Sequence, residues 1–228
     1  MNQKTWLLAG LVIAAGVGLI RMANAGGGGA GAAKVRKGDR ILMMGDSLGV
    51  GLSTPMKGLV SDAKELGAQF ASTSCGGTTT FQYVNQRYQG GCLDCTKGIT
   101  SNCNTMLLGS IKAFQPTLVL ISLGTNDAYG QVKPEVILQS ARDLIQLLQA
   151  TGARVAWIGP PKLAPVYAYQ GGSNTLRPEV LAQLRQAVTE AGCPWFDSTL
   201  LEIPQFDGIH SNAKGYAGWA ANIWNWLQ

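Results

Sequence analysis

From residue 40 to the C-terminus the sequence alternates short apolar runs with segments of helical periodicity, and this alternation restricts the possible folds strongly. The runs lie at 40–47, 68–74, 117–127, 154–161 and 194–199. The first, third and fourth are almost continuously apolar, which is typical of parallel strands covered on both faces. The pattern therefore predicts an α/β fold with a parallel five-stranded sheet.

Three segments carry apolar residues at spacings of four, three and four, as one face of a helix requires. The stripes are Ile137, Ala141, Leu144 and Leu148; Val180, Leu184, Ala187 and Ala191; and Tyr216, Ala220, Ile223 and Leu227. Alternating strands and helices predict a doubly wound sheet with helices on both faces. Such sheets bind ligands at the carboxyl ends of their strands, so functional residues should lie where the strands end.

Residues 1–25 differ from the rest of the chain. Lys4 precedes 16 uncharged, mostly apolar residues at 5–20, and the sequence Ala-Asn-Ala follows at 23–25. This arrangement predicts a cleaved signal peptide or an N-terminal membrane anchor with residues 5–20 as the tether; a buried helix is a third interpretation. A signal peptide and a membrane anchor both predict an exported protein that is periplasmic, secreted or anchored facing away from the cytoplasm. Residues 26–37 are predicted to be a glycine-rich linker and 38–228 the folded domain.

The charge balance gives little support for nucleic-acid binding. The chain has 18 basic and 13 acidic residues, a formal net charge of +5. Lys4 and Arg21 lie in the N-terminal segment, which has no acidic residue, so 16 basic and 13 acidic residues, or +3, remain. No cluster of basic residues is interleaved with aromatic ones, as nucleic-acid binding would favour.

The segment 81–104 interrupts the alternation, because it is polar, rich in glycine and contains three of the five cysteines. We predict that it is an insertion or a long loop. The cysteines are Cys75, Cys92, Cys95, Cys103 and Cys193. An exported chain favours at least one disulfide among the first four, with Cys193 reduced between a helix and a strand. Zinc binding and free thiols are the alternatives, and zinc has less support because no histidine is spare.

Candidate functional residues follow the first three predicted strands. Ser47 stands at the turn after the first strand, Gly76 and Gly77 follow the second, and Asn126 follows the third. Backbone N–H groups at these turns and the asparagine amide are suitable donors to a developing oxyanion. Local structure also explains each of them, since Ser47 and Asn126 could cap helices and the two glycines could form a turn.

His210 is the only histidine of the chain, and Asp207 precedes it by three positions. A lone histidine is often structural. A nucleophilic Ser47 needs a base, however, and Asp207 can hold one ring nitrogen of His210 while the other accepts the serine proton. We therefore predict a catalytic triad of Ser47, His210 and Asp207 that uses no metal and no cofactor.

With these motifs the chain resembles the GDSL esterases, also called SGNH hydrolases, from residue 40 to the C-terminus. The matching blocks are Gly45-Asp46-Ser47-Leu48, then Gly76 or Gly77, then Gly124-Thr125-Asn126-Asp127, and finally Asp207-Gly208-Ile209-His210. The resemblance implies a flavodoxin-like three-layer α/β/α sandwich and hydrolysis through an acyl-serine. It implies Ser47, Asp207 and His210 as catalytic residues. It also implies an oxyanion hole formed at Ser47, at Gly76 or Gly77, and by Asn126.

These observations predict a serine esterase of the carboxylesterase type. Its substrate would be an acylated small molecule or glycan, and we expect acetyl esters of an extracytoplasmic polysaccharide or of peptidoglycan. An acyltransferase and a lipid or aryl esterase would use the same triad. A non-catalytic binding or structural module on the same fold is an alternative of another class, and the intact motifs argue against it.

Overall fold

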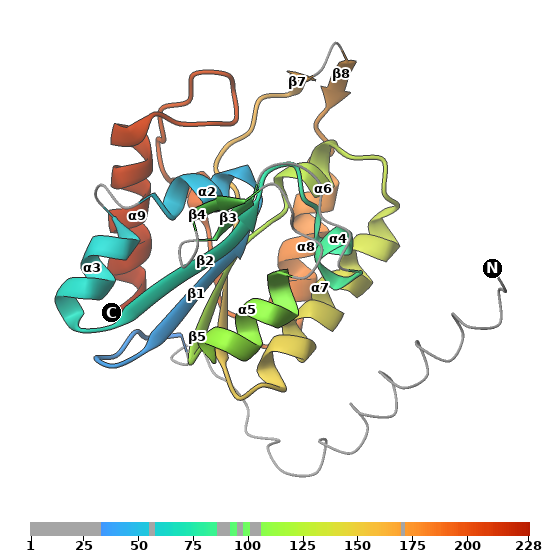
Figure 1. The fold of residues 1–228 in the computed structure, drawn as a ribbon. Helices are drawn as coiled ribbons and strands as arrows, with labels where there is room; N and C mark the ends of the chain where they lie inside the picture. The colour runs from blue at the N-terminus through green and yellow to red at the C-terminus, as the bar shows by residue number, and fades with distance from the viewer. Residues whose placement is uncertain (1–32, 55–57, 86–91, 95–97, 101–105, 170–171) are drawn as a thin grey trace, which may run out of the picture.

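The structure, a computed structural model, describes residues 33–54, 58–85, 92–94, 98–100, 106–169 and 172–228 (Figure 1). The predicted signal peptide or anchor, residues 1–25, lies outside the described residues. The Val35 N–H donates to the Leu227 carbonyl at 2.7 Å, and Arg154 donates to the Lys34 carbonyl. These bonds fix the start of the described chain at the amino ends of the strands. Within the described part, no helix is long and apolar enough to cross a membrane.

Five parallel strands form the centre of the sheet, in the order β2-β1-β5-β6-β9. They are β1 (Arg40–Gly45), β2 (Gln69–Cys75), β5 (Leu118–Ser122), β6 (Arg154–Ile158) and β9 (Trp195–Phe196). The register places Met43 of β1 opposite Ser72 of β2 and Leu120 of β5. The predicted parallel five-stranded sheet is confirmed. Its strand order is that of flavodoxin-like folds, with the switch point between β1 and β5.

Helices cover both faces of this sheet, so the domain has three layers (Figure 1). One face carries α2 (Ser47–Leu52), α3 (Leu59–Leu66) and α9 (Ala213–Leu227); the other carries α4 (Thr80–Val84), α5 (Met106–Phe114), α7 (Pro134–Gln149) and α8 (Pro178–Glu190). Because side chains alternate along a strand, Ile41 and Met43 of β1 pack with α2, α3 and α9. Leu42 and Met44 pack with α4, α7 and α8. The predicted apolar stripes lie on α7, α8 and α9.

Part of segment 81–104 has regular structure, so it is not a long loop throughout, whereas its prediction as an insertion stays a prediction. Thr79 and Gln82 form a capping box at the start of α4, and the fully buried Tyr83 donates its hydroxyl toward the carbonyl oxygens of Gly45 and Thr73, each at 2.7 Å. Two antiparallel strands, β3 (Cys92–Asp94) and β4 (Gly98–Thr100), extend the sheet beyond β2. Strands of three residues are too short to show an alternating pattern, so the sequence did not reveal them.

A two-stranded hairpin, β7 (Val166–Tyr169) and β8 (Gly172–Thr175), was also not predicted. It projects above the carboxyl edge of the sheet (Figure 1). The two short helices α6 (Thr125–Tyr129) and η1 (Ser198–Leu200) follow β5 and β9. The carboxyl edge is therefore surrounded by connections that can shape a binding site.

Two cysteines have defined states in the described part of the chain. Cys75 is disulfide-bonded, and the sheet register places it opposite Cys92. Cys193 is a buried free thiol in the turn between α8 and β9. Burial raises the pKa of Cys193 to about 12. This thiol should therefore stay protonated and unreactive at neutral pH.

Alkylation in two steps should distinguish these states in protein purified from an oxidising compartment. Iodoacetamide should label neither Cys75 nor Cys193 in the native protein. After unfolding without reductant, Cys193 should react, whereas Cys75 should react only once a reductant is added. Mass spectrometry of non-reduced peptides would identify the partner of Cys75, and the register favours Cys92. Labelling of Cys75 in the unfolded, unreduced protein would contradict this assignment.

Candidate active site

Ser47 is positioned by the turn that links β1 to α2. A Cβ atom at Gly45 would stand 2.6 Å from the Ser122 carbonyl oxygen, so the close approach of β1 to β5 requires glycine there. Asp46 is the N-cap of α2, and its carboxylate accepts a hydrogen bond from the Leu48 N–H at 2.9 Å. These contacts leave Ser47 half-buried as the first residue of α2, at the carboxyl edge of the sheet.

His210 is held by a carboxylate of its own loop. Asp207 Oδ2 lies 2.7 Å from His210 Nδ1. The other oxygen, Oδ1, accepts from the backbone N–H groups of Ile209 at 2.9 Å and His210 at 2.7 Å. Burial raises the pKa of Asp207, but the hydrogen bonds from His210 and Ile209 outweigh it and hold the pKa below its ordinary value. Asp207 is therefore an ionised carboxylate that orients both the ring and its loop.

The fold brings Ser47 and His210 together although 163 positions separate them in the chain. His210 Nε2 lies 2.8 Å from Ser47 Oγ. The side chains of His210 and Asp207 are 26% and 28% exposed, so this row of groups opens to solvent. The three residues predicted as a triad thus form one hydrogen-bonded row of hydroxyl, imidazole and carboxylate.

Asn126 contacts the residue that precedes Ser47. Its Nδ2 donates to the Thr78 carbonyl at 3.2 Å and to Asp46 Oδ2 at 3.3 Å. Gly76 and Gly77 form the adjacent turn, and Gly77 has a φ of 74°. Among the described residues, no group accepts a hydrogen bond from the backbone N–H of Ser47, Gly76 or Gly77. The predicted oxyanion donors are therefore close neighbours, and both glycines remain candidates.

Two contacts that were not apparent from the sequence hold Asn126 in place. The fully buried Asp127 accepts from the Thr80 N–H at 3.1 Å and from the Thr80 hydroxyl at 2.9 Å. Arg177 donates to the carbonyl oxygens of Asp127 at 2.6 Å and Val132 at 3.0 Å. The Gly-x-Asn-Asp block was a signal for Asp127, but no pattern marked Thr80 or Arg177.

Asp46 should make stability depend on pH. Burial raises its pKa from the ordinary 3.8 to about 7. The folded protein therefore keeps this proton to a higher pH than the unfolded chain, and the contribution of Asp46 to stability falls as pH rises through this window. In Asp46→Asn, position 46 does not titrate. The difference in unfolding free energy, wild type minus variant, should therefore decrease as the pH rises from 3.8 to about 7. Urea unfolding of both proteins below and above this range tests this, and a difference that rises or stays constant contradicts it.

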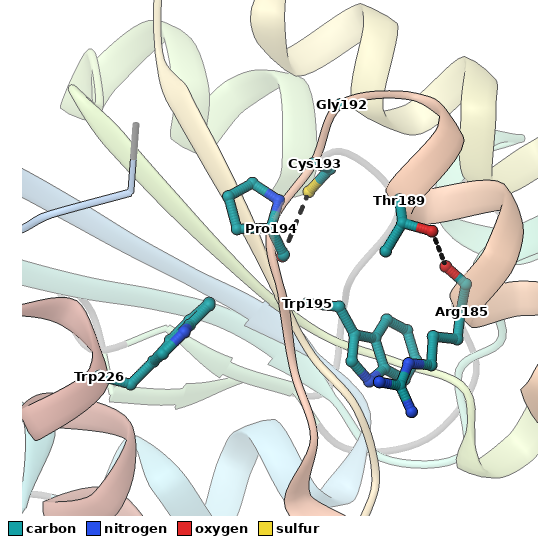
Figure 2. Close-up of a pocket in the computed structure, with 7 residues that line it drawn as sticks. All are labelled: Arg185, Thr189, Gly192, Cys193, Pro194, Trp195 and Trp226. Carbon is teal, nitrogen blue, oxygen red and sulfur yellow. Dashed lines mark hydrogen bonds between the residues drawn. The ribbon is translucent and has the colours of Figure 1, made fainter. Parts of the chain in front are cut away.

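A separate hollow of about 330 Å³ lies at the amino end of β9 (Figure 2). It is lined by Arg185 and Thr189 of α8, by Gly192, Cys193 and Pro194 of the following turn, by Trp195, and by Trp226 of α9. No predicted site residue lines it. Among the described residues, no group of three or more His, Cys, Asp or Glu side chains is arranged to hold a metal ion.

The parallel α/β sheet carries a serine, a histidine and an aspartate in one hydrogen-bonded row at its carboxyl edge, an arrangement typical of serine hydrolases. Residues 43–217 match the GDSL-like lipase/acylhydrolase family. Because this match covers most of the chain, the protein belongs to that family of ester hydrolases, also known as the SGNH family. No curated protein sequence matches the chain.

Solved structures with the same fold include esterases. The acetyl xylan esterase AlAXEase is similar with a TM-score of 0.60 and 15% identity, over 81% of this chain and 98% of that one. The acetylxylan esterase Axe2 of Geobacillus stearothermophilus gives 0.59 and 15%, over 85% and 96%. The psychrotrophic esterase EstA of Pseudoalteromonas sp. gives 0.59 and 18%, over 82% and 95%. These similarities show the SGNH hydrolase fold.

Proposed function

We propose that the protein is a serine esterase that hydrolyses acyl esters, most simply acetyl esters, through an acyl-serine intermediate. The row from Asp207 through His210 to Ser47 carries this proposal. Because Asp207 accepts the hydrogen on Nδ1 of His210, the neutral ring presents an unprotonated Nε2 to the Ser47 hydroxyl. The serine thereby has a base within hydrogen-bonding distance, which the attack on an ester requires.

In the acylation step, Ser47 Oγ forms a bond to the ester carbonyl carbon while His210 Nε2 takes the hydroxyl proton. The carbonyl electron pair moves onto the oxygen, which receives hydrogen bonds from the Ser47 N–H, from the Gly76–Gly77 turn and from Asn126. To donate to the oxyanion, Asn126 Nδ2 gives up one of its two long hydrogen bonds, to the Thr78 carbonyl at 3.2 Å or to Asp46 Oδ2 at 3.3 Å. When the carbonyl re-forms, the bond to the alcohol breaks, and the alcohol leaves with the proton from Nε2.

In the deacylation step, a water molecule takes the place of the alcohol. His210 removes a proton from this water, which attacks the acyl carbon, and the same donors stabilise the second oxyanion. The bond to Ser47 Oγ then breaks, and the proton returns from Nε2 to the serine. The products are a carboxylic acid and a free alcohol, and the enzyme regains its starting state.

The substrate that we propose is an acetylated polysaccharide or peptidoglycan outside the cytoplasm. The signal or anchor pattern of residues 1–25 supports export. A disulfide at Cys75 is compatible with an oxidising compartment. Two of the similar structures are acetyl xylan esterases, which favours a sugar alcohol over a lipid one.

Acetate release from a panel of substrates tests the proposal. The purified full chain should release acetate from p-nitrophenyl acetate and from at least one of acetylated xylan and O-acetylated peptidoglycan. A serine-directed phosphonate should stop the release and label Ser47. If no ester is cleaved, the protein is a binding or structural module. If acetate appears only on an added acceptor sugar, the protein is an acyltransferase, and either result overturns the proposal.

A further inference from the structure

Two aromatic rings flank the imidazole of His210. The Phe206 ring centroid lies 6.2 Å from that of His210, with 27° between the planes. The Tyr167 ring, on the β7–β8 hairpin, lies 6.3 Å away on an edge-on approach of 66°. Phe206 is 73% exposed, so most of its ring is accessible to a ligand. A ligand bound next to the imidazole could therefore also contact the exposed Phe206 ring.

The backbone holds Phe206 in this exposed position. The Phe206 N–H donates to the His210 carbonyl at 2.9 Å, and the neighbouring Gln205 side chain donates to the Lys162 carbonyl at 2.9 Å. The backbone of this loop therefore needs little further ordering when a ligand covers the ring. Phe206 is therefore suited to act as a fixed contact surface.

The loop of His210 and the base of the β7–β8 hairpin are joined as one unit. The Ala164 N–H donates to the Gly208 carbonyl at 3.0 Å, and the Tyr129 hydroxyl donates to the Ala164 carbonyl. Gly208 has a φ of 87°, and a Cβ atom there would stand 2.6 Å from the Ala164 Cβ. Only glycine permits this packing. Tyr167, three residues after Ala164, is thereby kept in a fixed relation to His210.

The chemistry of the triad assigns these rings to one half of the substrate. His210 Nε2 delivers its proton to the departing alcohol, so the alcohol oxygen must come within hydrogen-bonding distance of that nitrogen. The acyl half instead lies toward the oxyanion donors at Ser47 and Asn126. Groups that flank the imidazole, such as Phe206 and Tyr167, therefore contact the alcohol half.

An open aromatic face favours one kind of alcohol. A pyranose ring has one face of C–H groups that packs against the negative face of an aromatic ring, while its hydroxyl groups stay in water. A long alkyl alcohol would leave most of its apolar surface in water on a ring that is 73% exposed. We infer that Phe206, with Tyr167 beside it, is a platform that binds the sugar ring of the ester's alcohol half. This inference rests on the proposed esterase function.

Matched substrates and variants test the platform. The substrates are an O-acetylated methyl xylopyranoside and ethyl acetate, which share the acetyl group and differ in the alcohol. Phe206→Leu keeps apolar bulk but removes the aromatic face. It should raise KM for the xylopyranoside about 3- to 10-fold more than KM for ethyl acetate, as the loss of one stacking contact predicts. The kcat values should change less than KM, and Phe206→Trp should restore the xylopyranoside KM.

The control is Leu200→Ala, since Leu200 is 80% exposed but no part of the site is assigned to it. It should alter the two KM values equally, if at all. An equal effect of Phe206→Leu on both substrates, or no rescue by Phe206→Trp, overturns the platform while the esterase function stands. If the wild type cleaves ethyl acetate but not the xylopyranoside, the platform is likewise overturned while the esterase function stands. If the wild type cleaves neither ester, the proposed function fails, and the platform fails with it.

Discussion

Replacement of Ser47 by alanine should lower kcat for ester hydrolysis by about 10⁵- to 10⁶-fold, the loss typical of a removed nucleophile in a triad. The alanine has no oxygen to form the acyl-enzyme, so only the oxyanion donors and substrate binding remain to accelerate attack by water. The fold should survive, because Ser47 is half-buried and the hydrogen bond of its hydroxyl is to His210. Acetate release and circular dichroism of the same preparation would measure both effects.

Ser110→Ala is a matched control. Ser110 lies on α5, which packs on the opposite face of the sheet from α2. This change should leave kcat within about twofold of the wild type, as surface substitutions away from a site usually do. Near-wild-type hydrolysis by Ser47→Ala would mean that another residue is the nucleophile, and the proposed mechanism would be wrong.

Asp207→Asn should be the next most damaging change, with a loss in kcat of about 10⁴-fold. The asparagine oxygen can still accept from the backbone N–H groups of Ile209 and His210, so the loop should keep its shape. The amide NH₂ would then face Nδ1 of His210 and favour the tautomer that carries its hydrogen on Nε2. That tautomer cannot accept the proton of Ser47, so the base is lost while the geometry is kept.

Measurement of kcat/KM over a range of pH, together with thermal unfolding, separates this explanation from simple misfolding. In the wild type, Asp207 stays ionised into acid because its pKa is held low, so it keeps orienting the ring. Asp207→Asn should be slow across the whole range and melt within a few degrees of the wild type. Asp197→Asn is the control, since Asp197 caps η1 and pairs with Arg185 outside the site. A fully active Asp207→Asn enzyme would remove the case for the triad.

The residues of the candidate site could be predicted because each one is marked locally. Ser47 and Asn126 stand within a few residues of the ends of β1 and β5, and the fold class alone requires those strand ends to meet. Asp207 and His210 are three positions apart, so their contact needs no knowledge of the fold. The apolar stripes on α7, α8 and α9 were equally clear, because buried helices of this length show the 3.6-residue period.

Other parts of the site depend on contacts that leave no mark in the sequence. The buried carboxylate of Asp127 meets Thr80 across 47 positions, and neither residue type predicts the other. The hairpin at 166–175 has strands of four residues, too short for a clear alternation. Phe206 is exposed because its loop folds back, with the Phe206 N–H bonded to the His210 carbonyl. This contact leaves no mark in the sequence. Gly76 and Gly77 are adjacent in one turn, so the sequence pattern marks both equally.

The bond between Val35 and Leu227 also has a consequence for where the enzyme can work. It fixes the entry of the chain at the amino ends of the strands, whereas Ser47 lies at their carboxyl ends. Residues 21–33 can span at most roughly 45 Å when fully extended. If residues 5–20 stay in a membrane, the chain would be attached at the end of the domain opposite Ser47. On this proposal the active site would be accessible to polymers away from the membrane surface, and the lipids would lie next to the other end of the domain.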